Sequence, residues 1–148
     1  MKKKIKLSII MLVHNEEKSI KKEIQDIYKI IARKFKNIEF IITQDGSDDD
    51  SNKILNSIKK KYKIKYYSFK HRLGVHNALL FSLKKATGDY IFFMDSGKKF
   101  IIREFFKIYK FKDKFDIVSG YRINRQDQKY RIILTYLFNL FLRIFTMS

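Results

Sequence analysis

The sequence contains no cysteine, no proline and no tryptophan, and only five of its 148 residues are glycine. Without cysteine, neither a disulfide framework nor a thiolate metal site can form, and this absence fits a reducing compartment. The lack of proline and tryptophan accompanies abundant lysine, isoleucine, phenylalanine, tyrosine and asparagine. AT-rich coding produces such a bias by itself, so it carries no information about function.

Long hydrophobic runs are also missing. The apolar run of residues 7–13 ends at His14, Asn15 and Glu16 without the small-residue cleavage site of a signal peptide. No apolar run reaches the ~20 residues that span a bilayer. We therefore predict a cytoplasmic protein, either free or peripheral on the inner face of the cytoplasmic membrane.

Acidic residues are few, since 15 Asp and Glu stand against 33 Lys and Arg, which gives a formal net charge of +18. A basic surface attracts the phosphates of nucleic acids. Most of this charge, however, is lysine scattered over every segment, whereas nucleic-acid readers usually cluster arginines with aromatic side chains on one face. Nucleic acid is therefore not the expected main partner, and the charge suits an anionic membrane surface or a phosphorylated ligand equally well.

Apolar runs of strand length alternate with segments of helical spacing, and 148 residues with 45% hydrophobic content can bury one core. The alternation predicts an α/β fold with a mostly parallel sheet flanked by helices. Helices are expected to begin near Asn15, near Ser47 and at Val75. The expected strands are residues 5–13, 38–43, 64–69, 90–94 and 115–119. A core-facing stripe is expected on the first helix at Ile20, Ile24, Ile27 and Ile31.

Acidic residues gather where two of these strands are expected to end. Asp45 follows the second strand and Asp95 the fourth, each close to a glycine that lets a ligand approach the backbone. In open parallel sheets, ligands bind beyond the carboxyl ends of the strands. A carboxylate there can accept hydrogen bonds from a base or ribose, or can hold a divalent cation that bridges phosphates. For Asp48, Asp49 and Asp50, a simpler role in the turn and helix cap is favoured.

Four blocks of the sequence resemble, in order, the successive blocks of inverting family 2 glycosyltransferases with the GT-A fold. The blocks are LSIIMLVHNEEKSI, EFIITQDGSDDDS, GVHNALLFSLKKATGDYIFFMDSG and FDIVSGYRINRQDQKYRIILTYLFNLFLRIF. Together they cover nearly the whole chain from Leu7 onward. Within the family, the sequence looks most like the branch that transfers sugars to polyprenyl phosphates, such as dolichyl or undecaprenyl phosphate.

The resemblance implies a site for a nucleotide-sugar donor and a divalent metal, Mg or Mn. Asp45 would contact the nucleotide base, and Asp95 would hold the metal as the first acid of a DxD-like motif. Arg122 and Arg131 match arginines that meet phosphates of the donor or of the lipid acceptor, a role suited to guanidinium. The implied nucleotide-sugar-binding residues are Leu12, His14, Glu16, Asp45, Asp95, Ser96 and Gly97.

Three positions depart from the family pattern. Gln44 replaces the first acid of an Asp pair, Leu12 replaces a proline, and Gly97 replaces the second acid of the DxD motif. Magnesium needs only one or two carboxylates beside a diphosphate, so Gly97 would weaken the metal site without abolishing it. No residue after Asp127 is acidic, and no catalytic base can be named. The sequence looks like the donor-binding part of a longer enzyme, truncated at the C-terminus, with a missing C-terminal half or a membrane partner.

The last segment, residues 128–148, is expected to form an amphipathic helix that follows a nucleotide-sugar-binding core of residues 1–127. Its polar positions recur at every fourth residue, at Arg131, Thr135, Asn139 and Arg143. Nearly all the other positions are apolar, which makes an arc wider than a helix on one sheet face normally buries. Two interpretations stay open: the helix lies in a membrane interface, or it packs against protein.

The leading hypothesis for function is an inverting glycosyltransferase that uses a nucleotide-sugar donor and a polyprenyl phosphate acceptor in cell-envelope polysaccharide or glycolipid synthesis. Metal and basic groups would stabilise the departing nucleoside diphosphate, and an acceptor phosphate, already anionic, needs little deprotonation. Two alternatives remain. One is a truncated, catalytically inactive module that binds nucleotide sugars, and the other is a basic nucleic-acid or membrane-surface binding protein.

Overall fold

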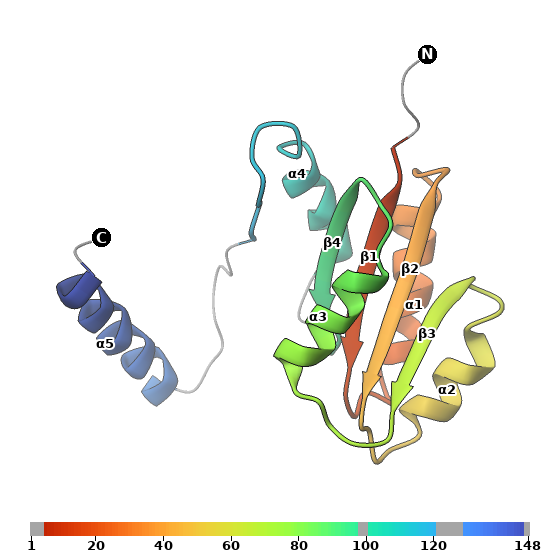
Figure 1. Cartoon of the computed structure of the whole chain (residues 1–148), viewed down its shortest axis with the longest axis horizontal. Helices are drawn as coiled ribbons and strands as arrows, with labels where there is room; N and C mark the ends of the chain where they lie inside the picture. The colour runs from red at the N-terminus through yellow and green to blue at the C-terminus, as the bar shows by residue number, and fades with distance from the viewer. Residues whose placement is uncertain (1–4, 98–100, 121–128, 147–148) are drawn as a thin grey trace. The chain divides into compact units, whose positions relative to one another are not determined.

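The computed structural model describes residues 5–97, 101–120 and 129–146, and the chain divides into two units, Met1–Val118 and Ser119–Ser148 (Figure 1). Four parallel strands form the sheet of the first unit, in the order β3-β2-β1-β4. Their bounds are Leu7–Val13 for β1, Ile38–Asp45 for β2, Ile64–Phe69 for β3 and Tyr90–Asp95 for β4. The predicted α/β fold class is confirmed.

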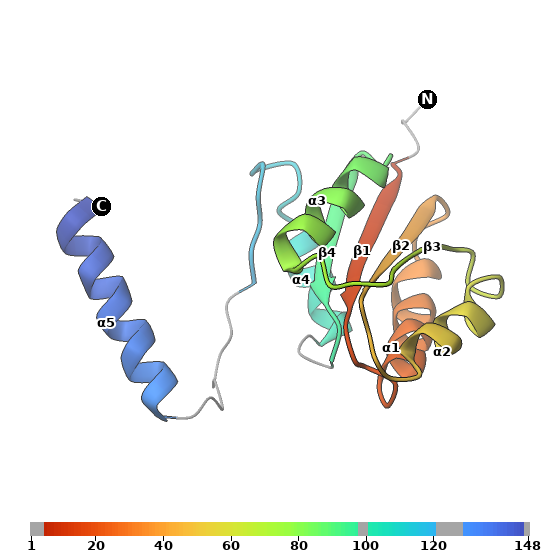
Figure 2. The ribbon, with the colours of Figure 1, turned by 60° about the horizontal axis from the view of Figure 1, so that its bottom comes forward.

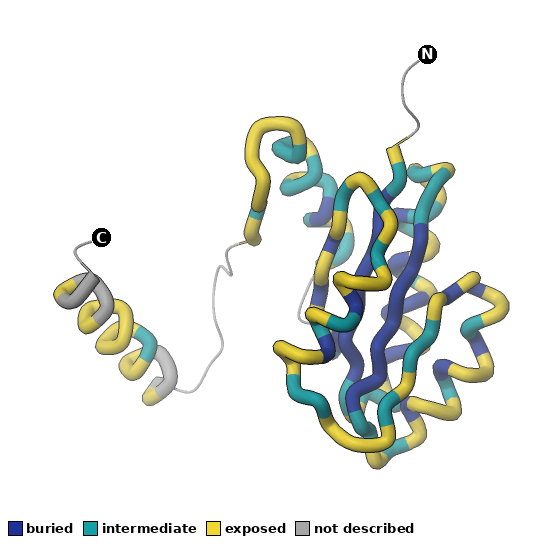
Figure 3. Tube along the Cα trace, in the orientation of Figure 1, coloured by how far each residue is buried: buried dark blue, intermediate teal, exposed yellow. Residues whose placement is uncertain are grey.

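The centre of the sheet is formed by β1, all seven of whose residues are buried (Figure 3). Its sequence LSIIMLV is almost wholly apolar, as expected of a parallel strand that is covered on both faces. In β2, seven of eight residues are also buried. The two outer strands, β3 and β4, are only partly buried. The carboxyl ends of β2 and β4 therefore lie on either side of β1, the most completely buried strand of the sheet.

Helices cover both faces of the sheet (Figures 1 and 2). On one face lie α1 (Ile20–Ile27), its π-helical continuation η1 (Tyr28–Ala32), and α2 (Ser51–Ile58). On the opposite face lies α3 (Val75–Lys85). After β4, a short turn of 3-10 helix, η2 (Ile102–Glu104), leads into α4 (Phe105–Tyr109).

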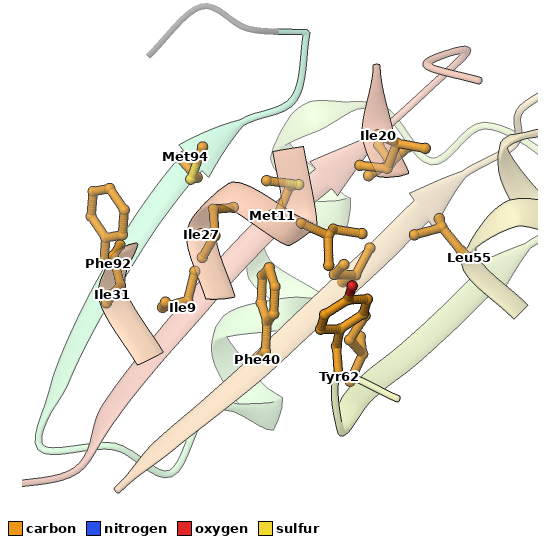
Figure 4. Close-up of a cluster of buried hydrophobic side chains, with 14 of the residues drawn as sticks. Ile9, Met11, Ile20, Ile27, Ile31, Phe40, Leu55, Tyr62, Phe92 and Met94 are labelled. Atoms are coloured by element: carbon orange, nitrogen blue, oxygen red, sulfur yellow. The ribbon is translucent and has the colours of Figure 1, made fainter. Parts of the chain in front are cut away.

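The main hydrophobic core lies between the sheet and the layer of α1 and α2 (Figure 4). Alternate side chains of β1, including Ile9 and Met11, meet Phe40 from β2 and Phe92 from β4 there. The predicted isoleucine stripe is confirmed, because all four members are at most 1% exposed: Ile20, Ile24, Ile27 and Ile31. Burial of one such side chain contributes about 1.5–3 kcal/mol, so this stripe anchors α1 to the sheet.

Two predicted helix starts are wrong. α1 begins at Ile20 rather than near Asn15, and α2 begins at Ser51 rather than near Ser47. Asn15 has a left-handed backbone (φ 53°), which a helix N-cap does not adopt. The polar side chains of both residues bond to the neighbouring loop instead of to their own helix. The predicted start of α3 at Val75 is confirmed.

The strand predicted at residues 115–119 is also wrong. These residues form no regular structure, and Phe115 and Ile117 are 62% and 87% exposed. An apolar run becomes a strand only when a neighbouring strand accepts and donates its backbone hydrogen bonds. In the described part of the chain, these residues have no such neighbour.

The second unit contains α5 (Lys129–Thr146), in the segment where the amphipathic helix is expected. Among the described residues, no helix combines the length and the apolar character needed to cross a membrane. The proposed division of the chain after residue 127 stays a prediction.

A buried carboxylate, Glu39 at the start of β2, ties the amino ends of the strands together. Its Oε2 lies 2.6 Å from Lys65 Nζ, and its Oε1 accepts hydrogen bonds from the Ser8 hydroxyl and the Thr87 backbone N–H, both at 2.5 Å. Burial by itself would raise the pKa of Glu39, but these hydrogen bonds outweigh it and lower the pKa to about 2. Glu39 thus joins β1, β2, β3 and the turn before β4 at the end of the sheet opposite Asp45.

We expect Glu39→Gln to lower the free energy of unfolding by up to about 3 kcal/mol at pH 7. The native pKa lies below the unfolded value, so this stability is present above about pH 4.5 and is lost as the pH falls towards 2. Urea unfolding followed by circular dichroism at pH 7 and pH 3 measures both effects. A matched control is Glu104→Gln, which removes a solvent-exposed ion pair with Lys107 and should cost less than about 1 kcal/mol. Equal losses in the two variants would contradict the expectation.

Candidate functional site at the carboxyl edge of the sheet

Asp45 and Asp95 lie at the same edge and on the same face of the sheet. Thr43 of β2 and Asp95 of β4 both pair with Leu12 of β1, so these three residues form one row across the sheet. Asp45 lies two residues beyond Thr43, and alternate residues of a strand point to the same face. Two strand spacings separate β2 from β4, which places the two aspartate-bearing strands roughly 10 Å apart. The prediction that both carboxylates come from the carboxyl ends of separate strands is confirmed.

The Asp45 carboxylate is 4% exposed and holds the loop that precedes α3. Its Oδ1 accepts a hydrogen bond from the backbone N–H of Leu73 at 2.6 Å, and its Oδ2 accepts one from Gly74 at 3.1 Å. Gly46 makes the close approach of this loop possible. A Cβ there would lie 2.6 Å from the backbone nitrogen of Arg72, and its φ of 62° also favours glycine. Asp45 therefore positions the loop of residues 70–74 as well as ending β2.

The acidic turn after β2 is bonded to the loop after β1. Asp49 accepts hydrogen bonds from the backbone N–H of Glu17 and of Ser51. In return, the Glu17 carboxylate accepts one from the backbone N–H of Asp50 at 3.1 Å. The Asp48 backbone N–H donates to Asn15 Oδ1. The Asp49 carboxylate thus has the structural role favoured for it, since it bonds both the loop after β1 and the first residue of α2. Asp48 and Asp50 bond to the loop after β1 through their backbone N–H groups.

The loop after β4 has a different geometry from the one that its sequence suggests. Gly97 has a φ of 92°, and its backbone N–H donates to both carboxylate oxygens of Glu23, at 3.1 and 3.2 Å. Glu23 lies on α1 and is only 5% exposed. A Cβ at position 97 would lie 2.5 Å from Oε1 of Glu16. The position of the second acid of a DxD motif is therefore occupied by a glycine that the backbone and Glu16 both require.

The remaining predicted site residues fall into two groups. Leu12 is 8% exposed within β1, and His14 follows that strand with its Nδ1 2.8 Å from the backbone oxygen of Asp45. Ser96 is buried next to the exposed Asp95, and its N–H points to the Leu12 oxygen at 3.4 Å. Two arginines are not brought into this site by any described contact. Arg122 lies outside the described residues, and the side chain of Arg131, within α5, does too.

Sequence reasoning missed two parts of this edge, the loop of residues 70–74 and Glu23. The loop carries Arg72, an exposed cation that the Asp45 carboxylate and Gly46 bring close to the end of β2. A signal for the loop was its sequence KHRLG, basic and ending in glycine before a helix. Glu23 gave no such signal, because a glutamate within an amphipathic helix normally faces solvent.

A metal is implied by the family resemblance, and the residues present fit it only in part. In the ranges that the structure describes, no three His, Cys, Asp or Glu side chains gather into a metal-binding group. Asp95, exposed at the end of β4, offers one carboxylate. Because magnesium keeps several waters and binds mainly to substrate phosphates, one carboxylate can suffice once a diphosphate is present. A single carboxylate thus fits a metal that binds together with the nucleotide, rather than one that the protein holds before the nucleotide binds.

The known proteins whose sequences resemble this chain include several glycosyltransferases. An uncharacterised glycosyltransferase of Rickettsia conorii is 34% identical over 112 residues, 76% of this chain and 16% of that protein. An undecaprenyl-phosphate 4-deoxy-4-formamido-L-arabinose transferase of Pectobacterium atrosepticum is 26% identical over 141 residues, 93% of this chain and 43% of that protein. The chain therefore spans less than half the length of these relatives.

Solved structures show the same fold. Glucosyl-3-phosphoglycerate synthase from Mycobacterium tuberculosis, in complex with Mn²⁺, UDP and phosphoglyceric acid, has 25% identity and a TM-score of 0.51. The match covers 62% of this chain and 33% of that one. The parallel sheet described above thus belongs to a GT-A fold, of which this chain covers a part. The profile of Glycosyl transferase family 2 matches residues 8–147, and the chain belongs to that family.

Proposed function

We propose that this chain binds a nucleotide-sugar donor at the carboxyl edge of its sheet and serves transfer of the sugar, with inversion, to a polyprenyl phosphate. The observation that carries the proposal is the placement of Asp45 and Asp95 on one face at the ends of two strands that flank β1. Such an edge is where ligands bind in open parallel sheets. The GT-A relative that was solved with UDP and Mn²⁺ supports a nucleoside diphosphate and a divalent cation as ligands.

In this proposal, residues of the edge bind and orient the donor. The end of β2 and the loop of residues 70–74, joined by Asp45, form the side that meets the base, where Arg72 adds positive charge. Asp95 at the end of β4 would hold the cation, which, when bound, stabilises the negative charge of the departing diphosphate. Glu23 fixes the backbone next to Asp95 through the Gly97 N–H. These side chains position the anomeric carbon, and none of them needs to act as a base.

The polyprenyl phosphate acceptor is supported by the names of two relatives. Proteins of Pectobacterium atrosepticum and Proteus mirabilis, 26% and 27% identical to this chain, are undecaprenyl-phosphate transferases. A phosphate acceptor also agrees with the chemistry of the site, because a phosphate oxygen is anionic at neutral pH and attacks without prior proton removal. Such an acceptor would bring the reaction to the inner face of the cytoplasmic membrane.

The test is a titration of the purified chain with UDP and GDP, with and without Mn²⁺, by calorimetry. We expect Mn²⁺ to lower the Kd of one nucleotide. In Asp95→Asn, the factor by which Mn²⁺ lowers this Kd should be at least about tenfold smaller. The matched control is Asp48→Asn, which removes the same charge from an exposed residue at the same edge and should leave the metal effect unchanged. Binding that Mn²⁺ does not affect, or an equal loss in both variants, would refute the role of Asp95.

A binding module without transferase activity is the second candidate, because Gly97 leaves one carboxylate fewer than the family motif. Incubation with a nucleotide sugar and undecaprenyl phosphate separates the two candidates. Formation of the glycosyl lipid supports the transferase, whereas metal-dependent nucleotide binding without product supports the module. Binding of oligonucleotides in place of nucleotides would overturn both.

A further inference from the structure

A cavity of about 250 Å³ lies near the amino ends of β2 and β3, at the end of the sheet opposite Asp45 and Asp95. Its buried lining includes Ile9 and Phe40, which are partners in neighbouring strands, and Ile27 of α1. Protein interiors hold few voids larger than a water molecule, and a cavity of about 150 Å³ is enough for benzene. The space is therefore large enough for a small organic molecule.

Aromatic rings form much of the wall of this cavity. Its lining includes Tyr28, Phe35, Phe40 and Tyr62, of which Phe40 and Tyr62 appear in Figure 4. The rings of Tyr28 and Tyr62 meet edge to face, with their centroids 5.2 Å apart. A further ring can join such a group in an edge-to-face or offset arrangement, which adds to the gain from burial. The wall therefore suits an aromatic group better than a flexible aliphatic chain.

The rim of the cavity is basic. Lys36 and Lys63 line it and are exposed, and none of the lining residues in the described part of the chain is acidic. Both lysines belong to basic connections that precede strands, RKFK at residues 33–36 and KKKYK at residues 59–63. Positive charge beside a low-dielectric wall attracts anions. A ligand that complements both the wall and the rim is thus aromatic at one end and negatively charged at the other.

The backbone is unusual at two places in the lining. The π-helix η1 both begins and ends at the cavity, with Tyr28 and Ala32. π-Helical turns are rare and occur frequently at functional sites. Lys63 has a left-handed φ of 50°, which is unfavourable for a lysine. Because such strained residues cluster at sites that hold ligands, both departures favour a binding site over a simple packing defect.

We propose that this cavity binds a small aromatic anion, such as an aromatic carboxylate. Its ring would lie against Tyr28, Phe40 and Tyr62, and its negative charge would lie at the rim with Lys36 and Lys63. The site is separate from the proposed donor site, and the inference stands whether or not the chain transfers a sugar. A ligand that binds only the folded chain also raises its thermal stability.

Calorimetric titration of the full chain with 2-naphthoate tests the proposal. The matched ligand is 2-naphthamide, which has the same rings and nearly the same shape without the charge. We expect 2-naphthoate to bind with a Kd below about 1 mM and at least about fivefold more tightly than the amide. UDP and Mn²⁺ should leave this Kd unchanged. Absence of binding, equal affinity for the two ligands, or displacement by UDP with Mn²⁺ would overturn the proposal.

Filling the cavity locates the binding site. Ala32→Leu places a larger side chain in the lining and should weaken binding of 2-naphthoate at least about tenfold. Ala86→Leu makes the same change at a half-buried alanine at the end of α3, on the other face of the sheet, and should leave the Kd within about twofold. 2-Naphthoate should raise the melting temperature of the parent and of Ala86→Leu, but not that of Ala32→Leu. Undiminished binding by Ala32→Leu would overturn the proposal.

A pair of double variants tests the rim without altering the core. Lys36→Gln combined with Lys63→Gln should weaken binding of 2-naphthoate about fivefold and leave binding of 2-naphthamide unchanged. Lys60→Gln combined with Lys84→Gln removes the same charge from exposed residues outside the cavity and should have little effect. Equal losses in the two double variants would overturn the proposal, because the overall charge of the chain would then explain the binding.

Discussion

In the Asp45→Ala variant, the free energy of unfolding is expected to fall by about 3–5 kcal/mol. The carboxylate is 4% exposed and accepts backbone hydrogen bonds from Leu73 and Gly74. A hydrogen bond to a charged group contributes about 1.5–3 kcal/mol, and alanine would leave two partly buried N–H groups without an acceptor. Most small domains have a stability of only about 5–15 kcal/mol, so the loss is a large share of the total. Urea unfolding followed by far-ultraviolet circular dichroism measures it.

Asp48→Ala is the control for this variant. It removes a carboxylate three residues further along the same turn, from an exposed position, and should change stability by less than about 0.5 kcal/mol. Nucleotide affinity, measured at a temperature where Asp45→Ala remains folded, shows whether the carboxylate also serves the donor. A loss of stability as small as that of Asp48→Ala would mean that the loop of residues 70–74 does not depend on Asp45.

Restoring the family motif by Gly97→Asp is expected to destabilise the chain by about 2–5 kcal/mol and not to improve metal binding. At a φ of 92°, a residue with a Cβ is strained by about 1–3 kcal/mol. The new Cβ would also meet Oε1 of Glu16 at 2.5 Å, which brings two carboxylates into one small space. Thermal unfolding and the Mn²⁺ dependence of nucleotide binding report the two effects separately.

Two further variants separate strain from charge at this position. Gly97→Ala adds the Cβ without a charge, so its cost relative to Gly97→Asp measures the repulsion. Combining Gly97→Asp with Glu16→Gln should recover part of the lost stability, because the two side chains are in contact and their effects are not additive. A Gly97→Asp variant that is as stable as the parent and binds Mn²⁺ more tightly would show that the loop can adopt the geometry of the family motif.

The strands and the core could be predicted because each depends on a local pattern. β1 is an apolar run, and the isoleucines of α1 follow the helical repeat, so burial follows from the sequence alone. The strand predicted at residues 115–119 has the same kind of pattern, and it fails because a strand also needs a neighbour. The periodicity of apolar residues shows which side chains are suited to burial. It does not show whether a neighbouring strand or helix is present to cover them.

The candidate site could be predicted only where it depends on strand order. Asp45 and Asp95 follow strands of a parallel sheet, and the general rule for such sheets places them at one edge. Their local surroundings depend on contacts between residues far apart in the sequence. The Asp45 carboxylate meets the loop of residues 70–74, and Glu23 meets Gly97 across 74 positions. The basic sequence KHRLG signals the loop but not its contact with Asp45. No spacing or motif signals the contact between Glu23 and Gly97, which helps to explain the glycine at position 97.

The burial of every residue of β1 has a consequence for how this edge can change. Because β1 lies between β2 and β4 and pairs with both, the distance between the ends of β2 and β4 is fixed by two ladders of backbone hydrogen bonds. Substitutions within β1 would damage the core before they altered that distance. Redesign for a different ligand should therefore act on exposed side chains of the turns that follow the strands, such as Asp48, His71 and Arg72, which can change without repacking the sheet.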